Sequence, residues 1–344
     1  MTGTVKNSTL HGNRAITLSA DSGDSSTLSA TFTGNTSTSG LPGSNQGNQG
    51  IQVSRSLTST LTFDVSSNNV NGMISTLINV FSGSGPGSVT APGAGAGTGV
   101  VKSNTLVGTG VGGNQAGIRV FNSGTSVVGF GSLFVNVANN NVSNIDNFYP
   151  ILGEASGSTG SGGLLQIAIT GNTANVVTGG AAAGLDSIRV QARNTSTVTA
   201  RISGNTTNSG GPGFFGIQLR RVNTATFNLE GLALGSQSDP TVHDFVVAQN
   251  PAGGTVGTLA AVGLSTITGV ANGFGAGIPP MLFAPGGVEA AASETSSTSD
   301  PTSTSNTSSD SSAAGGSTTS TSSAVTKSLT QDELNSIVAA ALAR

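Results

Sequence analysis

Acidic side chains are the first candidates for chemistry, because a sugar-cleaving site needs two carboxyl groups about 5–10 Å apart. Asp64 and Glu230 fall in strand-like segments and Asp186 directly precedes one, but none has an acidic partner one repeat away. Asp21 and Asp24 lie close together in a Ser/Gly segment that is typical of a solvated turn. The sequence therefore predicts no catalytic residue, and we expect a protein that is not an enzyme.

Histidine and cysteine offer no alternative chemistry. His11 and His243 stand at opposite ends of the repetitive part of the chain, so they cannot readily share a catalytic triad. The chain has no Cys and no glycine-aspartate calcium repeat, and neither Gly-rich segment, 93–99 or 179–184, is followed directly by Lys-Ser or Lys-Thr. We therefore expect no metal site and no cofactor.

Arginine is the one charged residue type that gathers in part of the sequence. The arginines concerned are Arg119, Arg189, Arg193, Arg201, Arg220 and Arg221. Arg119 and Arg189 share the middle position of an Ile-x-Val strand, and guanidinium groups bind carboxylates and sulfates well. The pattern predicts a face for an acidic ligand, either a glycan or a host or cell-surface protein. The alternative is a solvated strand face that keeps sheets from associating.

Composition excludes several classes of function. Of 344 residues 52 are Gly and 11 are Pro, only 4% are aromatic and none is Trp, which disfavours a core of bulky rings. A net charge of −3 gives no attraction to nucleic acid, and no apolar run reaches the roughly 18 residues that a membrane span needs. The N-terminus lacks the basic and apolar regions of a signal peptide. We expect no nucleic-acid partner and no membrane insertion.

Asparagine recurs at a nearly constant interval, which indicates a structural repeat. The series after Asn13 is Asn35, Asn68, Asn104, Asn140, Asn172 and Asn205, with spacings of 33, 36, 36, 32 and 33 residues between its members. Asn tolerates left-handed backbone geometry, and its amide can bond to the next Asn of a stack. We expect a structural Asn ladder at these six positions. The alternative is a set of ordinary turn asparagines without mutual bonds.

Three strand-like segments accompany each Asn. Apolar and polar residues alternate before it, as in FDVSSN ending at Asn68, and an Ile-x-Val segment such as Ile118–Val120 comes earlier in the repeat. A third apolar position, such as Val70, follows two residues after the Asn. Short one-faced strands must stack on neighbouring repeats to bury that face, so the sequence predicts an all-β parallel β-helix with coils of about 34 residues.

The repeats resemble those of large bacterial extracellular proteins, of the adhesin-like and autotransporter-like kind. The resemblance covers roughly residues 5–232 and implies a right-handed parallel β-helix, and segments of variable length such as 36–50 and 82–99 map to loops along one side. It also implies a non-enzymatic structural or adhesive region of a bacterial cell-surface or secreted protein, located outside the cell. The alternative is a carbohydrate-active β-helix enzyme, a polysaccharide lyase or a glycoside hydrolase.

The end of the chain has a different texture. Residues 226–251 resemble the segment that closes such arrays, and Leu232 occupies the Asn position, so we expect repeats over 1–232 and a cap over 233–286 that includes Phe245, Val246 and Val247. The Ser/Thr-rich segment 287–326 is typical of a disordered linker.

A short amphipathic α-helix is predicted over residues 327–344. Thr330 and Glu333 form a capping box, and apolar residues follow at helical spacing. This helix resembles the start of a module that follows such linkers in large bacterial surface proteins. We therefore expect the chain to be a C-terminal fragment of a larger parent protein. The alternative is a helix that lies on a membrane surface, which the scarcity of Lys and Arg disfavours.

Overall fold

The computed structural model places the repetitive part of the chain in one compact unit, Met1–Gly286, and the remainder, Gly287–Arg344, in a second unit. The residues that the structure describes are 1–11, 16–23, 25–38, 49–56, 58–83, 96–109, 116–124, 132–146, 148–157, 163–177, 186–208, 214–261 and 267–270. The predicted linker at 287–326 and helix at 327–344 lie outside the described residues, as do Asn13 and Asp24.

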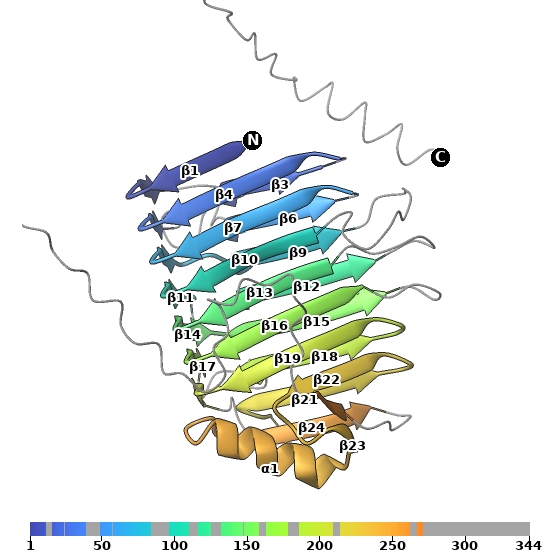
Figure 1. Ribbon diagram of the computed structural model, residues 1–344. Helices are drawn as coiled ribbons and strands as arrows, with labels where there is room; N and C mark the ends of the chain where they lie inside the picture. The colour runs from blue at the N-terminus through green and yellow to red at the C-terminus, as the bar shows by residue number, and fades with distance from the viewer. Residues whose placement is uncertain are drawn as a thin grey trace, which may run out of the picture. The chain divides into compact units, whose positions relative to one another are not determined.

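The first unit is a parallel β-solenoid, as the sequence predicted (Figure 1). Its strands form three sheets, and each coil passes through sheet C, sheet A and sheet B in turn. In stacking order, sheet A contains β1 (Thr2–Lys6), β4 (Thr27–Thr33), β7 (Thr60–Ser66), β10 (Ala96–Lys102), β13 (Ser132–Ala138), β16 (Leu164–Thr170), β19 (Thr197–Ser203), β22 (Thr226–Glu230), β25 (Ile267–Val270) and β23 (Gly235–Gln237).

Sheets B and C follow the same stacking order. Sheet B contains β2 (Thr9–His11), β5 (Thr36–Thr38), β8 (Asn69–Asn71), β11 (Thr105–Val107), β14 (Asn141–Ile145), β17 (Thr173–Val176) and β20 (Thr206–Thr207). Sheet C contains β3 (Ile16–Ser22), β6 (Gln49–Ser56), β9 (Thr76–Gly83), β12 (Ala116–Gly124), β15 (Ile151–Gly157), β18 (Ile188–Arg193), β21 (Ile217–Val222) and β24 (Val256–Ala261).

Aliphatic side chains fill the space inside the coils. The parallel register stacks equivalent residues of successive strands, so that each inward position becomes a column along the solenoid. One such column in sheet C is buried throughout and consists of Leu18, Ile51, Ile78, Ile118, Ile151, Ile188 and Ile217. The Ile-x-Val pattern therefore marks the strands whose first and third residues face the core.

The corner between sheets A and B requires a left-handed residue in every coil. The residue before each ladder Asn has a positive φ, for example Gly34 at 68°, Asn139 at 54° and Gly171 at 65°. Gly and Asn adopt this conformation at low cost, which explains their use at four of the six corners; Ser67 and Ser103 adopt it at the other two.

The C-terminal end of the solenoid is closed by the helix α1 (Asp239–Gln249). Ser238 caps its N-terminus by accepting a hydrogen bond from the Thr241 amide, and Val242 and Val246 are fully buried against the core. The predicted cap is correct for Val246 but wrong for Val247, which is 40% exposed because it lies on the outer side of the helix. Within the described residues there is no helix with the length and hydropathy of a membrane span.

Strands of the solenoid are also found beyond residue 232, where the sequence predicts a cap. After α1 the chain returns to the solenoid, where β24 pairs in parallel with β21 and β25 pairs in parallel with β22. The pattern fails at Leu232 because the chain leaves the coil there to form β23 and α1. Sheets A and C nevertheless continue beyond this excursion, so α1 is an insertion before the last strands.

Candidate functional site

The six predicted asparagines form one continuous hydrogen-bonded ladder. Each Nδ2 donates to the Oδ1 of the next member, over 3.0 Å from Asn35 to Asn68 and 2.9 Å from Asn104 to Asn140. The backbone amide of each Asn donates to the same oxygen, as Asn68 does to Asn104 over 2.9 Å. All six are buried, so the ladder joins the coils from within.

The ladder has two end members that sequence analysis missed. At its C-terminal end Asn205 Nδ2 donates to Asn250 Oδ1 over 2.9 Å, and Asn250 is the C-cap of α1. At its N-terminal end the backbone amide of Ser8 donates to Asn35 Oδ1 over 3.0 Å. Asn250 was missed because the α1 insertion stretches its distance from Asn205 to 45 residues, beyond the period of the repeat.

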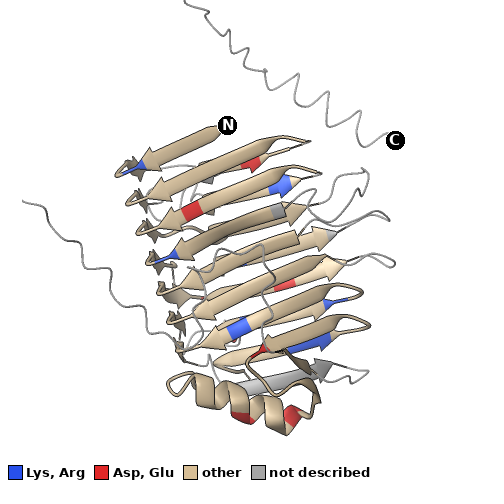
Figure 2. Cartoon of the chain, viewed as in Figure 1, with Lys and Arg blue, Asp and Glu red and all other residues tan. Residues whose placement is uncertain are grey.

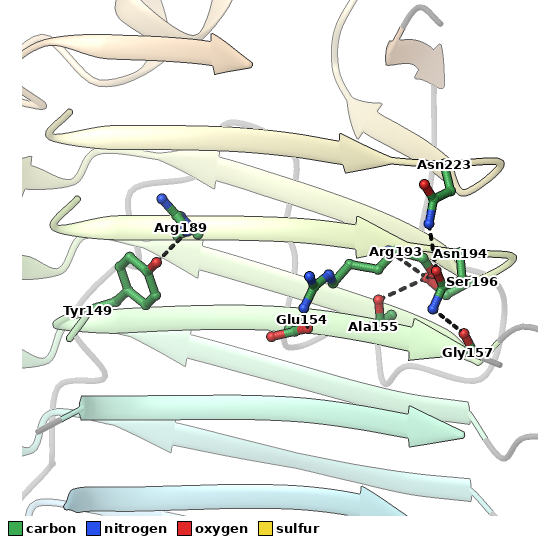
Figure 3. A network of polar contacts seen from close by, with 9 residues as sticks. All are labelled: Tyr149, Glu154, Ala155, Gly157, Arg189, Arg193, Asn194, Ser196 and Asn223. Carbon is green, nitrogen blue, oxygen red and sulfur yellow. Dashed lines mark hydrogen bonds and ion pairs between the residues drawn. The ribbon is translucent and has the colours of Figure 1, made fainter. Parts of the chain in front are cut away.

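A shorter pairing of asparagines stabilises the corner between sheets C and A (Figure 3). Asn223 Nδ2 donates to Asn194 Oδ1 over 2.7 Å, and Asn194 Nδ2 donates to the Gly157 carbonyl. Both asparagines have φ near 60°. The Asn-Thr pairs at 194–195 and 223–224, each directly after a sheet C strand, are the sequence signal for this corner.

The six predicted ligand-binding arginines do not share one face. Arg119, Arg189, Arg193 and Arg220 alternate with buried residues of sheet C and lie on its outward side. Arg201 belongs to sheet A, where it pairs with Glu230. Figure 2 shows how sparsely charged residues are distributed over the solenoid.

Arg221 does not belong to the outward face that the sequence predicted for it. It has the inward parity of Ile217 and Leu219, and its Nε donates to the Ala225 carbonyl at the corner after β21. Burial lowers the pKa of Arg221. The missed signal is parity: adjacent residues such as Arg220 and Arg221 must point to opposite faces of a strand.

Two of the outward arginines of sheet C lie over aromatic rings. The Arg119 guanidinium carbon lies 4.5 Å from the centre of the Phe121 ring, and that of Arg189 lies 4.3 Å from the Tyr149 ring centre. Phe121 also contacts Phe81 of the preceding coil, with ring centres 5.8 Å apart. We call Phe81, Arg119, Phe121, Tyr149, Arg189 and Arg220 the arginine–aromatic surface.

Internal carboxylates hold part of this surface in place. Asp186 is buried, and its Oδ2 accepts from Arg189 Nε at 3.0 Å and from a terminal nitrogen of Arg189 at 2.7 Å. Arg189 also donates to the Tyr149 hydroxyl (Figure 3). Because its charge is matched by Asp186, Arg189 orients Tyr149 rather than offering a free charge.

Arg119 and Arg220 are the arginines of this surface with donors left over. The Nε atoms of both are enclosed and have no hydrogen-bond acceptor among the described residues. Burial lowers the pKa of Arg119, and the nearby carboxylate of Glu154 partly opposes this. Glu154 itself pairs with Arg193 over 3.4 Å.

Tyr149 lies among these charged groups. Burial raises the pKa of Tyr149, and Arg189 and Arg220 act in the opposite direction. Its hydroxyl therefore stays protonated at neutral pH. Sequence analysis missed Tyr149 and Glu154 because β15 reads Ile-Leu-Gly rather than Ile-x-Val, so its strand was not recognised.

The other acidic and histidine candidates are dispersed. Asp64 and Glu230 share one outward column of sheet A but are five strands apart, about 24 Å at the usual strand spacing. His11 bonds to Thr38 in sheet B, whereas His243 contacts Asp244 on α1. Among the described residues no three His, Asp or Glu side chains form a group that could hold a metal ion.

The chain matches no protein-family model, no curated protein and no solved structure with which it was compared.

Proposed function

We propose that the chain is a non-enzymatic structural and adhesive repeat region of a bacterial cell-surface or secreted protein, and that its arginine–aromatic surface binds an acidic glycan. The solenoid serves as the scaffold, because its coils are joined by three sheets and by the internal Asn ladder. A scaffold of this kind holds a surface residue in place without needing a large aromatic core.

The observation that carries the proposal is the combination of rings and uncommitted guanidinium donors on one side of sheet C. Arg119 and Arg220 form no ion pair within the described residues, so their guanidinium charges are not neutralised, and Phe121 and Tyr149 provide apolar ring surface on the same side of the sheet. Carboxylate or sulfate groups of a glycan would accept from the guanidinium groups, and the sugar rings would pack on the aromatic side chains.

The test is binding of the purified chain to a panel of acidic and neutral polysaccharides. We expect binding to acidic members that weakens with added salt, and affinity about tenfold or more lower in the Arg119→Ala, Arg220→Ala double variant. Lys102→Ala is the control, because it removes an exposed positive charge from sheet A. No binding to any acidic polysaccharide, or equal losses in the arginine variant and the control, would refute the proposal.

A reducing-sugar release assay on the same panel tests the alternative of a carbohydrate-active enzyme. The two carboxylates beside the arginine–aromatic surface are already in ion pairs, Asp186 with Arg189 and Glu154 with Arg193. We expect no release of sugar above the level without protein. Release that disappears in Glu154→Gln would replace the adhesive proposal with the enzymatic one.

A further inference from the structure

The two ends of the solenoid are finished differently. At the C-terminal end, α1 covers the core with Val242 and Val246, and β23 pairs antiparallel with the edge strand β25 (Figure 1). At the N-terminal end, β1, β2 and β3 are the outermost strands of sheets A, B and C. In the described residues nothing pairs with the free edges of these three strands.

The N-terminal edge is open to solvent. Thr2, Gly3, Thr4 and Lys6 of β1 are exposed, and so are Thr9 and His11 of β2. Val5 and Leu10 pack against the core but are only partly buried, whereas Phe32, which pairs with Val5 in the next coil, is 4% exposed. The edge therefore combines unpaired strand backbone with incompletely covered apolar side chains, the combination that adds strands from a partner.

The backbone between β1 and β2 has the conformation found at the same corner of the interior coils. Asn7 has a φ of 50°, as the corner residue of a regular coil does, and its amide donates to the Thr33 carbonyl over 3.0 Å. Ser8 occupies the ladder position, with its amide bonded to Asn35 Oδ1. The backbone of the outermost coil therefore has the conformation of an interior coil, and Ser8 places a hydroxyl where interior coils present the accepting amide of an Asn.

We propose that the N-terminal edge is an interaction surface that binds a further three-strand coil of the same repeat pattern, through parallel pairing with β1, β2 and β3. Neighbouring coils of the solenoid already pair in this way. An added coil would pair with β1, β2 and β3 in the same strand register. A second copy of the chain cannot supply that coil by head-to-tail stacking, because α1 covers its C-terminal end.

The register of sheet A allows a direct test. Thr2 pairs with Ser29, and the columns of sheet A place Met1 where β22 has Phe227. A copy of residues 188–226 fused directly before Met1 therefore brings copies of β19, β20 and β21 against β1, β2 and β3. We expect the copied segment to resist limited proteolysis and the midpoint of thermal unfolding to rise by about 5 °C or more.

The control carries the same extension with its copies of Val198 and Ile202 replaced by Ser, which removes the apolar face that must be buried. Cleavage of both extensions at the same rate, with unchanged unfolding midpoints, would overturn the proposal. Light scattering on the unextended chain adds a second arm. A dimer that the intact extension abolishes would identify a second copy as the occupant and would also overturn the proposal.

Discussion

At the scale of single residues, the buried amides of the ladder are the most consequential groups in the protein. The side-chain amide of Asn140 makes four hydrogen bonds: its Oδ1 accepts from the backbone and side chain of Asn104 at 3.0 and 2.9 Å, and its Nδ2 donates to Val101 O and Asn172 Oδ1 at 2.8 and 2.9 Å. Each partner is inside the solenoid, where an unsatisfied polar group is costly.

We predict that Asn140→Ala lowers the free energy of unfolding by about 3 kcal/mol, because several buried donors and acceptors lose their partners together. Urea unfolding followed by circular dichroism measures the change. Asn141→Ala is the matched control, since Asn141 is an exposed neighbour in β14. Equal effects of the two substitutions would contradict a stabilising role of the ladder.

Asp21 gives the protein a pH-dependent contribution to stability. Burial opposes its ionisation, but hydrogen bonds from Ser54, Ser19 and Gln52 outweigh this, and the pKa of Asp21 falls below its ordinary 3.8. A lowered folded-state pKa means that the ionised carboxylate stabilises the fold above the ordinary value, and that this contribution is lost as the pH falls through the lowered pKa.

We therefore predict that Asp21→Asn destabilises the chain more at pH 6 than at pH 3. Comparing the free energies of unfolding of the two proteins at each pH isolates Asp21 from other groups, such as Asp146, whose pKa burial raises. A difference that stays constant between the two conditions would argue against the hydrogen-bonded carboxylate.

At the scale of elements, α1 determines how the C-terminal end is protected. Its contact with the solenoid depends on two valines four residues apart, Val242 and Val246, which therefore lie on one side of the helix. Asn250 adds a polar link, because it both ends the helix and accepts from Asn205.

We predict that Val246→Ala lowers the free energy of unfolding by about 2 kcal/mol, through lost burial and a residual cavity. Val247→Ala should change it by less than about 0.5 kcal/mol, because Val247 is on the exposed side of α1. The two variants differ by one position and remove the same atoms, so equal losses in chemical denaturation would show that α1 does not cover the core.

At the scale of the whole molecule, the repeat made most of the fold predictable. Apolar alternation and the Asn period identified three strands per coil, because stacking in register makes every coil solve the same packing problem. Close contacts between coils were harder to predict from the sequence. At Gly117 a Cβ would overlap the Val142 side chain and the Pro150 carbonyl, which explains why a Gly directly precedes Ile118.

The candidate site was less predictable than the fold. The outward position of Arg119 follows from strand parity, and the same rule would have excluded Arg221. The rings that accompany the arginines do not repeat: Phe121 lies in β12, whereas Tyr149 lies in the connection from β14 to β15, whose sequence does not recur in the other coils. Residues outside the period carry no signal that a repeat analysis can detect.

The Asn ladder also gives the solenoid a dipole along its axis. Each amide from Asn35 to Asn205 accepts at Oδ1 from the coil before it and donates from Nδ2 to the next Asn, so the amide dipoles add along the stack, with their positive ends toward the C-terminus. The last of them, Asn250, donates to the Val246 carbonyl at 2.9 Å, at the end of α1 where the helix dipole is negative. Each amide polarises its neighbours, so the row strengthens as it lengthens and ends on a group of opposite sign.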